Sequence, residues 1–341
     1  MESPFGNDDV RSGSKSTDTL GEARLGSGGM SLSDAFLREQ LHSLGYREVE
    51  QVAIGMQGAV FRLGGGLVAK IWFHAGEGEL RTLGELYAAV DGRLPYRTPR
   101  VLELHRPGAY WVTIEEELPG VPLHAVAPQF GEVGWERMRD CVVEVVEAVA
   151  QVEAPAVLRR TTVLDEPDPF RPEGMSWIDA LSGLVRRRVA RFGDQLSPVI
   201  DNFEAKVENL LVLLSDLKEP ETRLVHGDVT AGNILVDENL RPVTLLDFGL
   251  LTMPGDPVFE AAATATVIDL WSPRAREIEA AFDKSFATHL GYAPRHLLTY
   301  RCAYSLIIAN AHDEDPYNRD THVPLTAKLF NSPEVAALLS R

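Results

Sequence analysis

The chain has 341 residues, of which 45% are hydrophobic and 24% are charged, so it can form one large or two ordinary globular domains with a sizeable core. Its net charge of −17 disfavours nucleic acid or an anionic membrane as the main partner and would attract a cationic substrate, although acidic surfaces more often simply keep proteins soluble. No apolar run approaches the roughly 20 residues of a membrane helix, and no signal peptide opens the chain. The only two cysteines, Cys141 and Cys302, stand in apolar helical contexts, so we expect core thiols in a cytoplasmic protein.

Residues 1–30 lack apolar periodicity and are rich in glycine and serine, which predicts a disordered tail; native translation could even begin at Met30. A short helix should follow from Asp34 to Leu44, with Ser33 as its N-cap. The folded part of the chain is therefore expected to begin at about residue 31.

Three strand patterns come next, over residues 49–54, 59–63 and 67–73. Gly55 and Gly58 lie in the first connection, and a glycine-containing hairpin of this kind can cover the phosphates of a nucleotide. Taken alone the two glycines are a weak signal, because they form only half of the glycine pattern known for such loops.

Lys70 stands in the middle of the third, apolar strand. Burying an ammonium group without a partner is costly, so we expect this lysine to face a carboxylate and a phosphate; the alternative is an edge-strand lysine that reaches solvent. The carboxylate should come from the next helix, predicted over residues 78–90, where Glu79 lies on the packed face. Glu77 and Glu85 remain alternatives.

Two further strands are predicted over residues 101–104 and 110–114, and the second ends in three consecutive glutamates before a proline-glycine pair. We expect the chain to pass here from an N-terminal domain, residues 31–118, to a C-terminal domain, residues 119–341. The glutamates could otherwise be only the solvated face of a hinge.

The second domain is predicted to be mainly helical, because apolar residues recur at three- and four-residue spacing over long stretches. One helix carries Arg186 to Arg188 and Arg191, which we interpret as a solvated basic face rather than an anion site. The expected helices are 135–152, 176–192, 201–217, 260–270, 274–290, 294–309 and 324–340.

The stretch from Leu224 to Gly249, LVHGDVTAGNILVDENLRPVTLLDFG, alternates short apolar strands with polar loops. It places His226, Asp228, Asn233 and Asp247 at strand ends, where a rigid sheet can aim side chains from the loops. The alternative is a surface β-meander whose Asp and Asn residues merely make turns.

These polar residues follow the spacing H-x-D, four further residues and Asn, and then D-F-G, which is a pattern of phosphoryl-transfer enzymes. Phosphoryl transfer needs one carboxylate to accept the proton of the acceptor hydroxyl, and Asp228 suits this role. It also needs oxygen ligands for Mg²⁺, and Asn233 and Asp247 suit that role. Gly249 would let the chain turn sharply after the metal ligand.

On these motifs the chain resembles the aminoglycoside phosphotransferase family, the antibiotic and small-metabolite kinases that share the protein-kinase fold. The resemblance covers about residues 52–309 and is most specific from His226 to Gly249, where Gly227 after the histidine is the form usual in this family. It implies an α+β, two-lobed, protein-kinase-like fold with a small β-rich N-lobe and a larger helical C-lobe.

The resemblance also implies which residues form the site. Asp228 would be the catalytic base, and Asn233 and Asp247 would bind Mg²⁺. The nucleotide, ATP or GTP, would be held by Lys70, Glu79, Gly55 and Gly58, with backbone groups of Glu116 and Leu118 at the purine.

Gly255-Asp256-Pro257 also looks like this family, with Asp256 as a structural anchor, whereas Glu260 stands where many members have an Asp-Leu-Ala-like run, so we assign Glu260 no role. Too few residues separate Asp247 from Gly255 for a long activation segment, and no arginine stands beside Asp228 to receive a phosphorylated one. We therefore predict a constitutively competent kinase of a small hydroxyl compound.

The sequence does not identify the acceptor molecule. Acidic clusters at Asp165 to Asp168 and at His312 to Asp320 could bind the ammonium groups of an aminoglycoside or another cationic antibiotic, although such a cluster is more often a plain surface loop. Alternatives are a macrolide, a nucleoside antibiotic, or a choline- or homoserine-like metabolite. A different class, a nucleotide-binding pseudokinase, is disfavoured because the lysine, both aspartates and the asparagine are all present.

Overall fold

The computed structural model describes residues 34–55, 57–268, 274–310 and 322–340. The expected tail, the N-cap Ser33 and the acidic cluster from His312 to Asp320 lie outside the described residues. Within them, no helix is both long and apolar enough to cross a bilayer.

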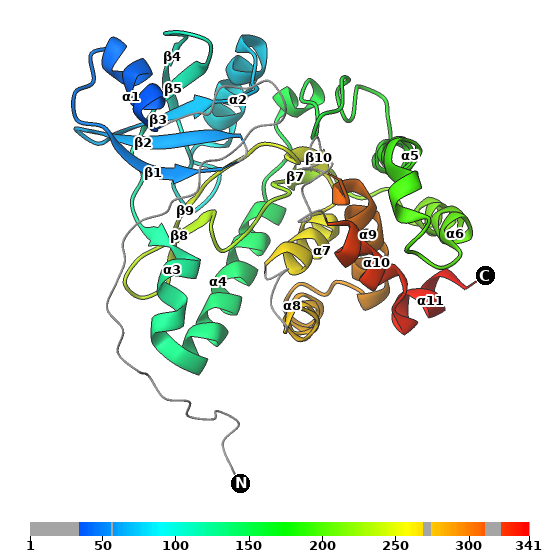
Figure 1. The fold of residues 1–341 in the computed structure, drawn as a ribbon. Helices are drawn as coiled ribbons and strands as arrows, with labels where there is room; N and C mark the ends of the chain where they lie inside the picture. The colour runs from blue at the N-terminus through cyan, green and yellow to red at the C-terminus, as the bar shows by residue number, and fades with distance from the viewer. Residues whose placement is uncertain (1–33, 56, 269–273, 311–321, 341) are drawn as a thin grey trace, which may run out of the picture.

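The N-terminal part is a five-stranded antiparallel sheet in the order β1-β2-β3-β5-β4, with α1 (Asp34–Ser43) and α2 (Glu77–Val90) beside it (Figure 1). The central position of β3 between β2 and β5 rules out the alternative that Lys70 lies on an edge strand. The strands are β1 (Glu50–Ile54), β2 (Gly58–Gly64), β3 (Leu67–Trp72), β4 (Val101–His105) and β5 (Trp111–Glu116).

The two faces of this sheet differ in character, because side chains alternate along a strand. One face packs against Leu37 and Leu41 of α1 and forms a separate core of apolar residues. The opposite face carries the polar residues near Lys70, since Lys70 pairs with Thr113 and Val68 with Glu115 across β3 and β5. The sheet therefore presents its polar face to the rest of the protein. The residues of the apolar face are Ala59, Phe61, Leu63, Ala69, Ile71, Val112 and Ile114.

The C-terminal part is helical and has its own core. α9 lies at its centre and packs against α5, α6, α7, α8, α10 and α11, so that its residues from Thr299 to Ile308 are all buried (Figure 1). Both cysteines are buried free thiols, as expected. The helices are α3 (Leu123–Val126), α4 (Gly131–Ala150), α5 (Trp177–Leu196), α6 (Phe203–Ser215), α7 (Pro257–Val267), α8 (Ala275–His289), α9 (Pro294–Ile308), α10 (Val323–Phe330) and α11 (Pro333–Leu339), with short 3-10 turns at Ala127–Phe130 and Ala156–Arg159.

Short strands join the two parts. β8 (Ile234–Val236) and β9 (Pro242–Leu245) form the predicted hairpin and pair with β6 (Val121–Pro122), which directly follows the N-terminal sheet. β7 (Arg223–Val225) pairs instead with β10 (Met253–Gly255), a strand that the sequence did not indicate. The loops after β7 and β9, which carry the predicted catalytic residues, lie side by side, because Nε2 of His226 is 2.8 Å from the backbone oxygen of Leu246.

The last predicted helix is wrong in one respect: residues 324–340 form two helices. Ser332 is extended, with ψ 149°, and its hydroxyl accepts a hydrogen bond from the N–H of Val335 as the N-cap of α11. The following residue is Pro333, and proline disfavours the helical conformation in the residue before it. α7 also begins earlier than predicted, at Pro257, because Asp256 caps it.

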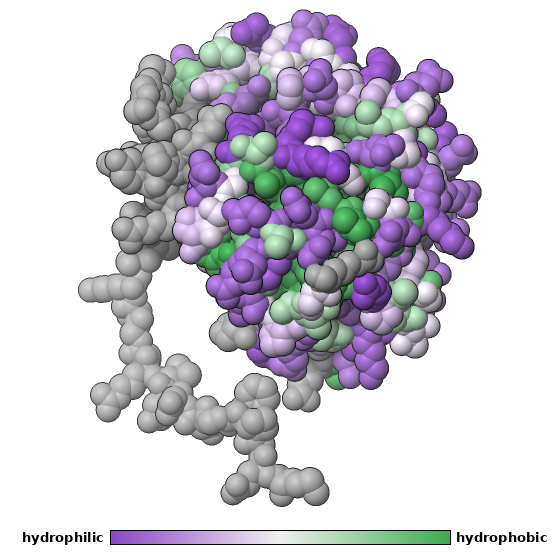
Figure 2. Space-filling model, turned by 90° about the vertical axis from the view of Figure 1, so that its right-hand side faces the viewer, coloured by the Kyte–Doolittle hydropathy of each residue, from purple (hydrophilic) through white to green (hydrophobic). Residues whose placement is uncertain are grey.

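Figure 2 shows the outer face of the C-terminal part, where apolar side chains gather inside a polar rim. Val212 of α6 and Val199 between α5 and α6 are exposed apolar residues. Helices α5 and α6 lie on the far side of the C-terminal part from the sheet (Figure 1), so this face is remote from the loops at the strand ends.

Candidate active site

The loop between β7 and β8 holds Asp228 in place through Asn233. The amide Nδ2 of Asn233 donates to both the backbone oxygen and Oδ2 of Asp228, each at 2.9 Å. Burial and, to a smaller extent, the nearby charge of Asp247 raise the pKa of Asp228 to about 7, although the bond from Asn233 opposes the shift. A carboxylate whose pKa is close to neutral suits proton abstraction from a hydroxyl.

His226 supports this loop rather than taking part in chemistry. Its Nε2 lies 2.8 Å from the carbonyl oxygen of Leu246, and its Nδ1 accepts a hydrogen bond of 3.2 Å from the backbone N–H of Asp228. Burial lowers the pKa of His226 to about 4, so the ring is neutral and carries its proton on Nε2. The histidine thus connects the end of β9 to the loop between β7 and β8, residues 226–233, which we call the catalytic loop.

Asp247 follows β9 in an unusual backbone conformation, with φ +64°. The next residue, Phe248, is buried against the ring of His226, at 4.5 Å between centroids, and against Tyr87 of α2, at 6.2 Å. A left-handed conformation is costly for a residue other than glycine, and such strain is typical of functional sites. Here it accompanies a buried phenylalanine and an aspartate that reaches the N-terminal sheet.

Lys70 meets Asp247 across the space between the sheet and the loops. Its Nζ lies 2.7 Å from Oδ1 of Asp247, 3.3 Å from Oε1 of Gln57 and 4.1 Å from the ring centroid of Trp72. The lysine side chain is only 13% exposed. The structure therefore brings together Lys70, Asp247 and Gln57 of the turn between β1 and β2.

The glutamates of α2 do not reach Lys70. Glu79 is exposed and accepts a hydrogen bond of 3.4 Å from the backbone N–H of Gly76, so it caps the start of α2. Glu77 is paired with Arg81 and Glu85 with Arg160. The expected Lys70–Glu79 pair is thus not formed in this structure; Lys70 is paired with Asp247 instead.

The two predicted glycines occupy different positions in the turn. The backbone N–H of Gly55 donates to the oxygen of Gly58 at 2.9 Å, which closes the turn. A Cβ on Gly58 would lie 2.0 Å from the backbone oxygen of Ile71, so only glycine lets β2 approach β3 there. Gly55 has open space around it. Gly58 is thus needed by the hairpin itself, and contact of either glycine with a nucleotide stays a prediction.

The three consecutive glutamates lie in different environments. Glu116 pairs with Arg97 at 3.0 Å and Glu117 with Arg62 at 2.6 Å, and both ion pairs are partly exposed. Glu115 is buried on the polar face of the sheet, 8% exposed, which a solvated hinge does not explain. Leu118 lies between β5 and β6, and the purine contacts of Glu116 and Leu118 stay predictions, as does the domain boundary there.

Glu260, to which the sequence assigned no role, binds the catalytic loop directly. Its Oε2 accepts hydrogen bonds from the backbone N–H groups of His226 and Gly227, the second at 3.0 Å. The residue is 0% exposed, and burial raises its pKa to about 7. Its place one turn after the helix cap Asp256, in an otherwise apolar first turn, was the signal that could have revealed it.

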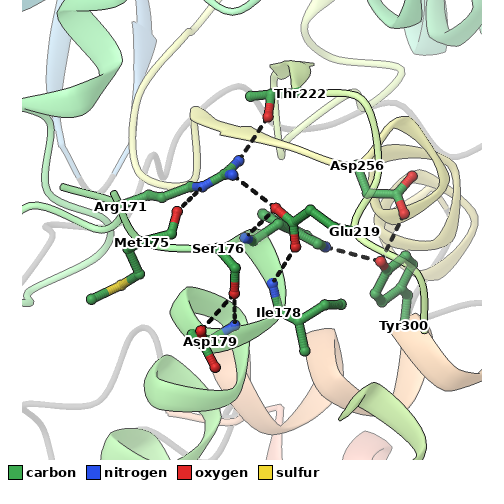
Figure 3. Close-up of polar contacts among 10 residues, drawn as sticks. Arg171, Met175, Ser176, Ile178, Asp179, Glu219, Thr222, Asp256 and Tyr300 are labelled. Atoms are coloured by element: carbon green, nitrogen blue, oxygen red, sulfur yellow. Dashed lines mark hydrogen bonds and ion pairs between the residues drawn. The ribbon is translucent and has the colours of Figure 1, made fainter. Parts of the chain in front are cut away.

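Asp256 is a structural anchor, as expected (Figure 3). Its Oδ1 accepts a 2.8 Å hydrogen bond from the N–H of Val258, and its Oδ2 accepts one of 2.7 Å from the hydroxyl of Tyr300. The same hydroxyl accepts a bond from Nε1 of Trp177, whose backbone N–H donates to Glu219. The start of α7, and with it Glu260, is thereby fixed to α9 and α5.

The basic face predicted on α5 is wrong in part. Arg188 is only 1% exposed; its Nε donates to the oxygen of Ile307 at 3.1 Å, and it is paired with Asp165. Arg191 also pairs with Asp165, and Arg187 pairs with Glu166. The arginines therefore hold the acidic loop against the C-terminal core, and its carboxylates already have cationic partners.

The oxygen ligands at the loop ends fit Mg²⁺. Because Nδ2 of Asn233 is engaged by Asp228, its amide oxygen is the group left for a cation, and Asp247 adds a carboxylate. Mg²⁺ favours a few such oxygens together with water and phosphate. The described residues contain no group of three or more His, Cys, Asp or Glu that could hold a metal.

This fold, with a lysine, two aspartates and an asparagine meeting between its parts, is that of a kinase-like phosphotransferase. Residues 48–298 match the phosphotransferase enzyme family, and the chain belongs to this family. The predicted resemblance and the predicted enzyme class are thereby confirmed. None of the curated proteins compared with the chain matches it.

Solved structures show the same fold. The aminoglycoside phosphotransferase APH(4)-Ia has a TM-score of 0.65 at 19% identity, over 89% of this chain and 98% of that one. A thermostable mutant of it, in a ternary complex with ADP and hygromycin B, has a TM-score of 0.64 at 20% identity, over 88% and 97%. The GDP and kanamycin complex of APH(2")-IIia has a TM-score of 0.56 at 15% identity, over 89% and 97%. The predicted α+β, kinase-like fold is confirmed.

Proposed function

We propose that the protein transfers the γ-phosphate of ATP or GTP to a hydroxyl group of a small molecule, with Mg²⁺ as cofactor. The observation that carries the proposal is Asp228, a carboxylate of pKa about 7 held by Asn233 next to the Lys70–Asp247 pair. We assign to these residues, which lie around one space, the roles of base, phosphate-binding cation and metal ligands. Enzymes of phosphoryl transfer need little beyond such positioning and charge compensation.

Each residue has a distinct task in this reaction. Asp228 accepts the proton of the acceptor hydroxyl as its oxygen bonds to the γ-phosphorus and the bond to the β-phosphate oxygen breaks. Lys70 binds phosphate oxygens and compensates their charge, while Asn233 and Asp247 hold Mg²⁺. When bound, Mg²⁺ neutralises charge on the phosphates. Glu260 and His226 keep the catalytic loop in place, and the neutral histidine leaves Asp228 as the base.

The nature of the acceptor follows from the shape of the loop after Asp247. The chain returns to β7 as β10 only a few residues later, so there is no long segment for binding a protein substrate. A small acceptor is also supported by the solved relatives, which bind hygromycin B, kanamycin and, with ATP, streptomycin. An aminoglycoside or another cationic antibiotic is accordingly the first candidate, with the net charge of −17 in its favour.

One observation weakens the role given to the first acidic cluster. Asp165 and Glu166 are already paired with arginines of α5, so they offer little free negative charge to an ammonium group. A macrolide, a nucleoside antibiotic, or a choline- or homoserine-like metabolite therefore stays in the comparison.

The test is a coupled nucleotide-turnover assay with Mg²⁺ and either ATP or GTP, run against a panel of these acceptors. Asp228→Ala should abolish acceptor-dependent turnover and retain nucleotide binding, whereas Asp140→Ala, at an exposed site on α4, is the matched control. Turnover that survives in Asp228→Ala would refute the assignment of the base. Nucleotide binding without turnover on any acceptor would favour the pseudokinase alternative.

A further inference from the structure

Lys70 needs a carboxylate partner that stays when Asp247 binds the metal. In this structure Asp247 is the direct ion-pair partner of the lysine, at 2.7 Å. The proposed reaction gives the same carboxylate to Mg²⁺, which would share its charge. A buried ammonium group with no other carboxylate nearby would then be poorly compensated.

The glutamates of α2 are poor candidates for this second partner. Glu79 caps its own helix, and the carboxylates of Glu77 and Glu85 are bound by arginines. All three are exposed. The helix approaches the site with Tyr87, whose ring packs against Phe248, and not with an acidic side chain.

Glu115 of β5 lies on the same face of the sheet as Lys70. The register places Thr113 directly opposite Lys70, and Glu115 is the next residue of β5 on that face. The hydroxyl of Thr113 donates to Oε1 of Glu115 at 2.6 Å, and Nε1 of Trp72 donates to the same hydroxyl at 3.0 Å. Both bonds are buried, so the carboxylate is held in one orientation.

The charges of these groups act on one another. Burial raises the pKa of Glu115, the bond from Thr113 and the charge of Lys70 lower it, and the charge of Asp247 raises it. Lys70 is the cation that acts on this buried carboxylate, and the Lys70 ammonium also pairs with Asp247. A buried carboxylate of this kind is costly unless a cation is close.

We propose that Glu115 is the residue that positions Lys70 for the nucleotide phosphates, in place of a glutamate from α2. The inference rests on the proposed function. In the free protein Lys70 is paired with Asp247; when Asp247 binds the metal, Glu115 keeps the lysine on the polar face of the sheet, directed at the phosphates. The hydrogen bonds from Trp72 to Thr113 and from Thr113 to Glu115 hold the Glu115 carboxylate in place. Glu115 is thus a positioning residue, and Lys70 is the one that touches the nucleotide.

The test compares three matched substitutions, Glu115→Gln, Glu79→Gln and Glu85→Gln. Binding of MgATP and of adenosine is measured by calorimetry in the absence of any acceptor. Glu115→Gln should weaken MgATP binding about ten- to a hundredfold, the effect of losing a charged partner, and leave adenosine binding within about twofold, because adenosine has no phosphate for Lys70 to bind. The other two variants should bind both ligands like the wild type. A general loss of structure would weaken adenosine binding as well.

Equal MgATP affinity in Glu115→Gln and the wild type would overturn the proposal. So would a selective loss in Glu79→Gln or Glu85→Gln, which would mean that α2 swings its glutamate to the lysine when nucleotide binds. If Glu115→Gln does not fold, Thr113→Val is measured instead, because it removes the hydroxyl that donates to the Glu115 carboxylate. This variant should show a smaller loss of affinity, selective for MgATP. An unchanged MgATP affinity would equally overturn the proposal. Because no acceptor is present, a protein that binds MgATP but phosphorylates nothing would contradict the proposed function alone.

Discussion

Glu260 offers a sharp test of how the catalytic loop is held. The structure gives its carboxylate two backbone donors, the N–H groups of His226 and Gly227, in a site with no exposure to water. Replacing it with alanine leaves both donors buried and unpaired. Each unsatisfied donor costs about 1–3 kcal/mol, so Glu260→Ala should lower the free energy of unfolding by about 2–6 kcal/mol. That is a large part of the roughly 5–15 kcal/mol typical of a folded protein.

Glu260→Gln separates the acceptor role from the charge. The amide keeps one oxygen for the backbone donors, so it should lose less stability than alanine, and the catalytic loop should keep its shape. Urea unfolding gives the stability, and acceptor turnover at saturating nucleotide gives the effect on kcat. Glu238→Ala, exposed in the turn between β8 and β9, is the control and should change neither. A free energy of unfolding of Glu260→Ala within about 1 kcal/mol of the wild-type value would refute the reasoning.

Four further results are expected. Because the pKa of Asp228 is about 7 and the base must be unprotonated, kcat/KM should rise with pH through about 7 and level off above it. A kcat/KM that does not change between about pH 5 and about pH 9 would contradict the role of base. The same raised pKa means that the folded state binds more protons than the unfolded one between 3.8 and about 7, so stability falls as pH rises through this window. Asp228→Asn should therefore be inactive yet unfold at a higher temperature than the wild type above neutral pH in metal-free buffer, and an equal or lower midpoint would count against burial as the cause. Asp247→Ala should lose Mg²⁺-dependent nucleotide binding, measured by calorimetry with and without chelator, and unaltered metal dependence would remove Asp247 from the metal site. Gly58→Ala places a methyl group 2.0 Å from the oxygen of Ile71, so the β1–β2 turn must shift and nucleotide affinity should drop, whereas Gly55→Ala, with open space around it, should fold as the wild type does; equal folding stability of the two would contradict the packing argument.

The elements of the fold were predictable because each carries a local signal. The strands around Lys70 and the hairpin from Ile234 to Leu245 follow apolar alternation and turn residues, and the structure confirms them. Asp228 and Asn233 were predictable as neighbours, because the short loop between two strands leaves them little freedom, and the structure joins them by hydrogen bonds.

Two errors came from signals that were present in the sequence. Arg188 follows Leu181, Leu184 and Val185 at helical spacing, and all three are buried, so the periodicity of α5 already placed it on the inner face. The run of arginines was treated as a unit, although successive helical residues point in different directions. The break before Pro333 likewise had its signal in a serine followed by proline, the usual start of a new helix.

The proposed second partner of Lys70, Glu115, could not have been predicted in the same way. Three glutamates, Glu77, Glu79 and Glu85, lie along α2, and the sequence cannot say how far the helix is rotated about its axis or how close it lies to the sheet. Glu115 is separated from Lys70 by a helix and another strand, and only the register of β3 with β5 brings the two onto one face. Long-range register is set by packing of the whole sheet, which no local pattern encodes.

The same contrast explains why Glu260 escaped notice while Asp228 did not. A residue that performs chemistry belongs to a short motif, because the strand ends that carry it are close in sequence. A residue that only supports the motif can come from any element that packs nearby, and its side chain is recognisable only by the donors it meets. In this protein the supports come from distant elements: Glu260 from α7 for the catalytic loop, and Asp256, Tyr300 and Trp177 for α7 itself. The residues proposed to carry out the reaction can therefore be recognised from the sequence. The residues that hold them in place can be recognised only from the folded structure.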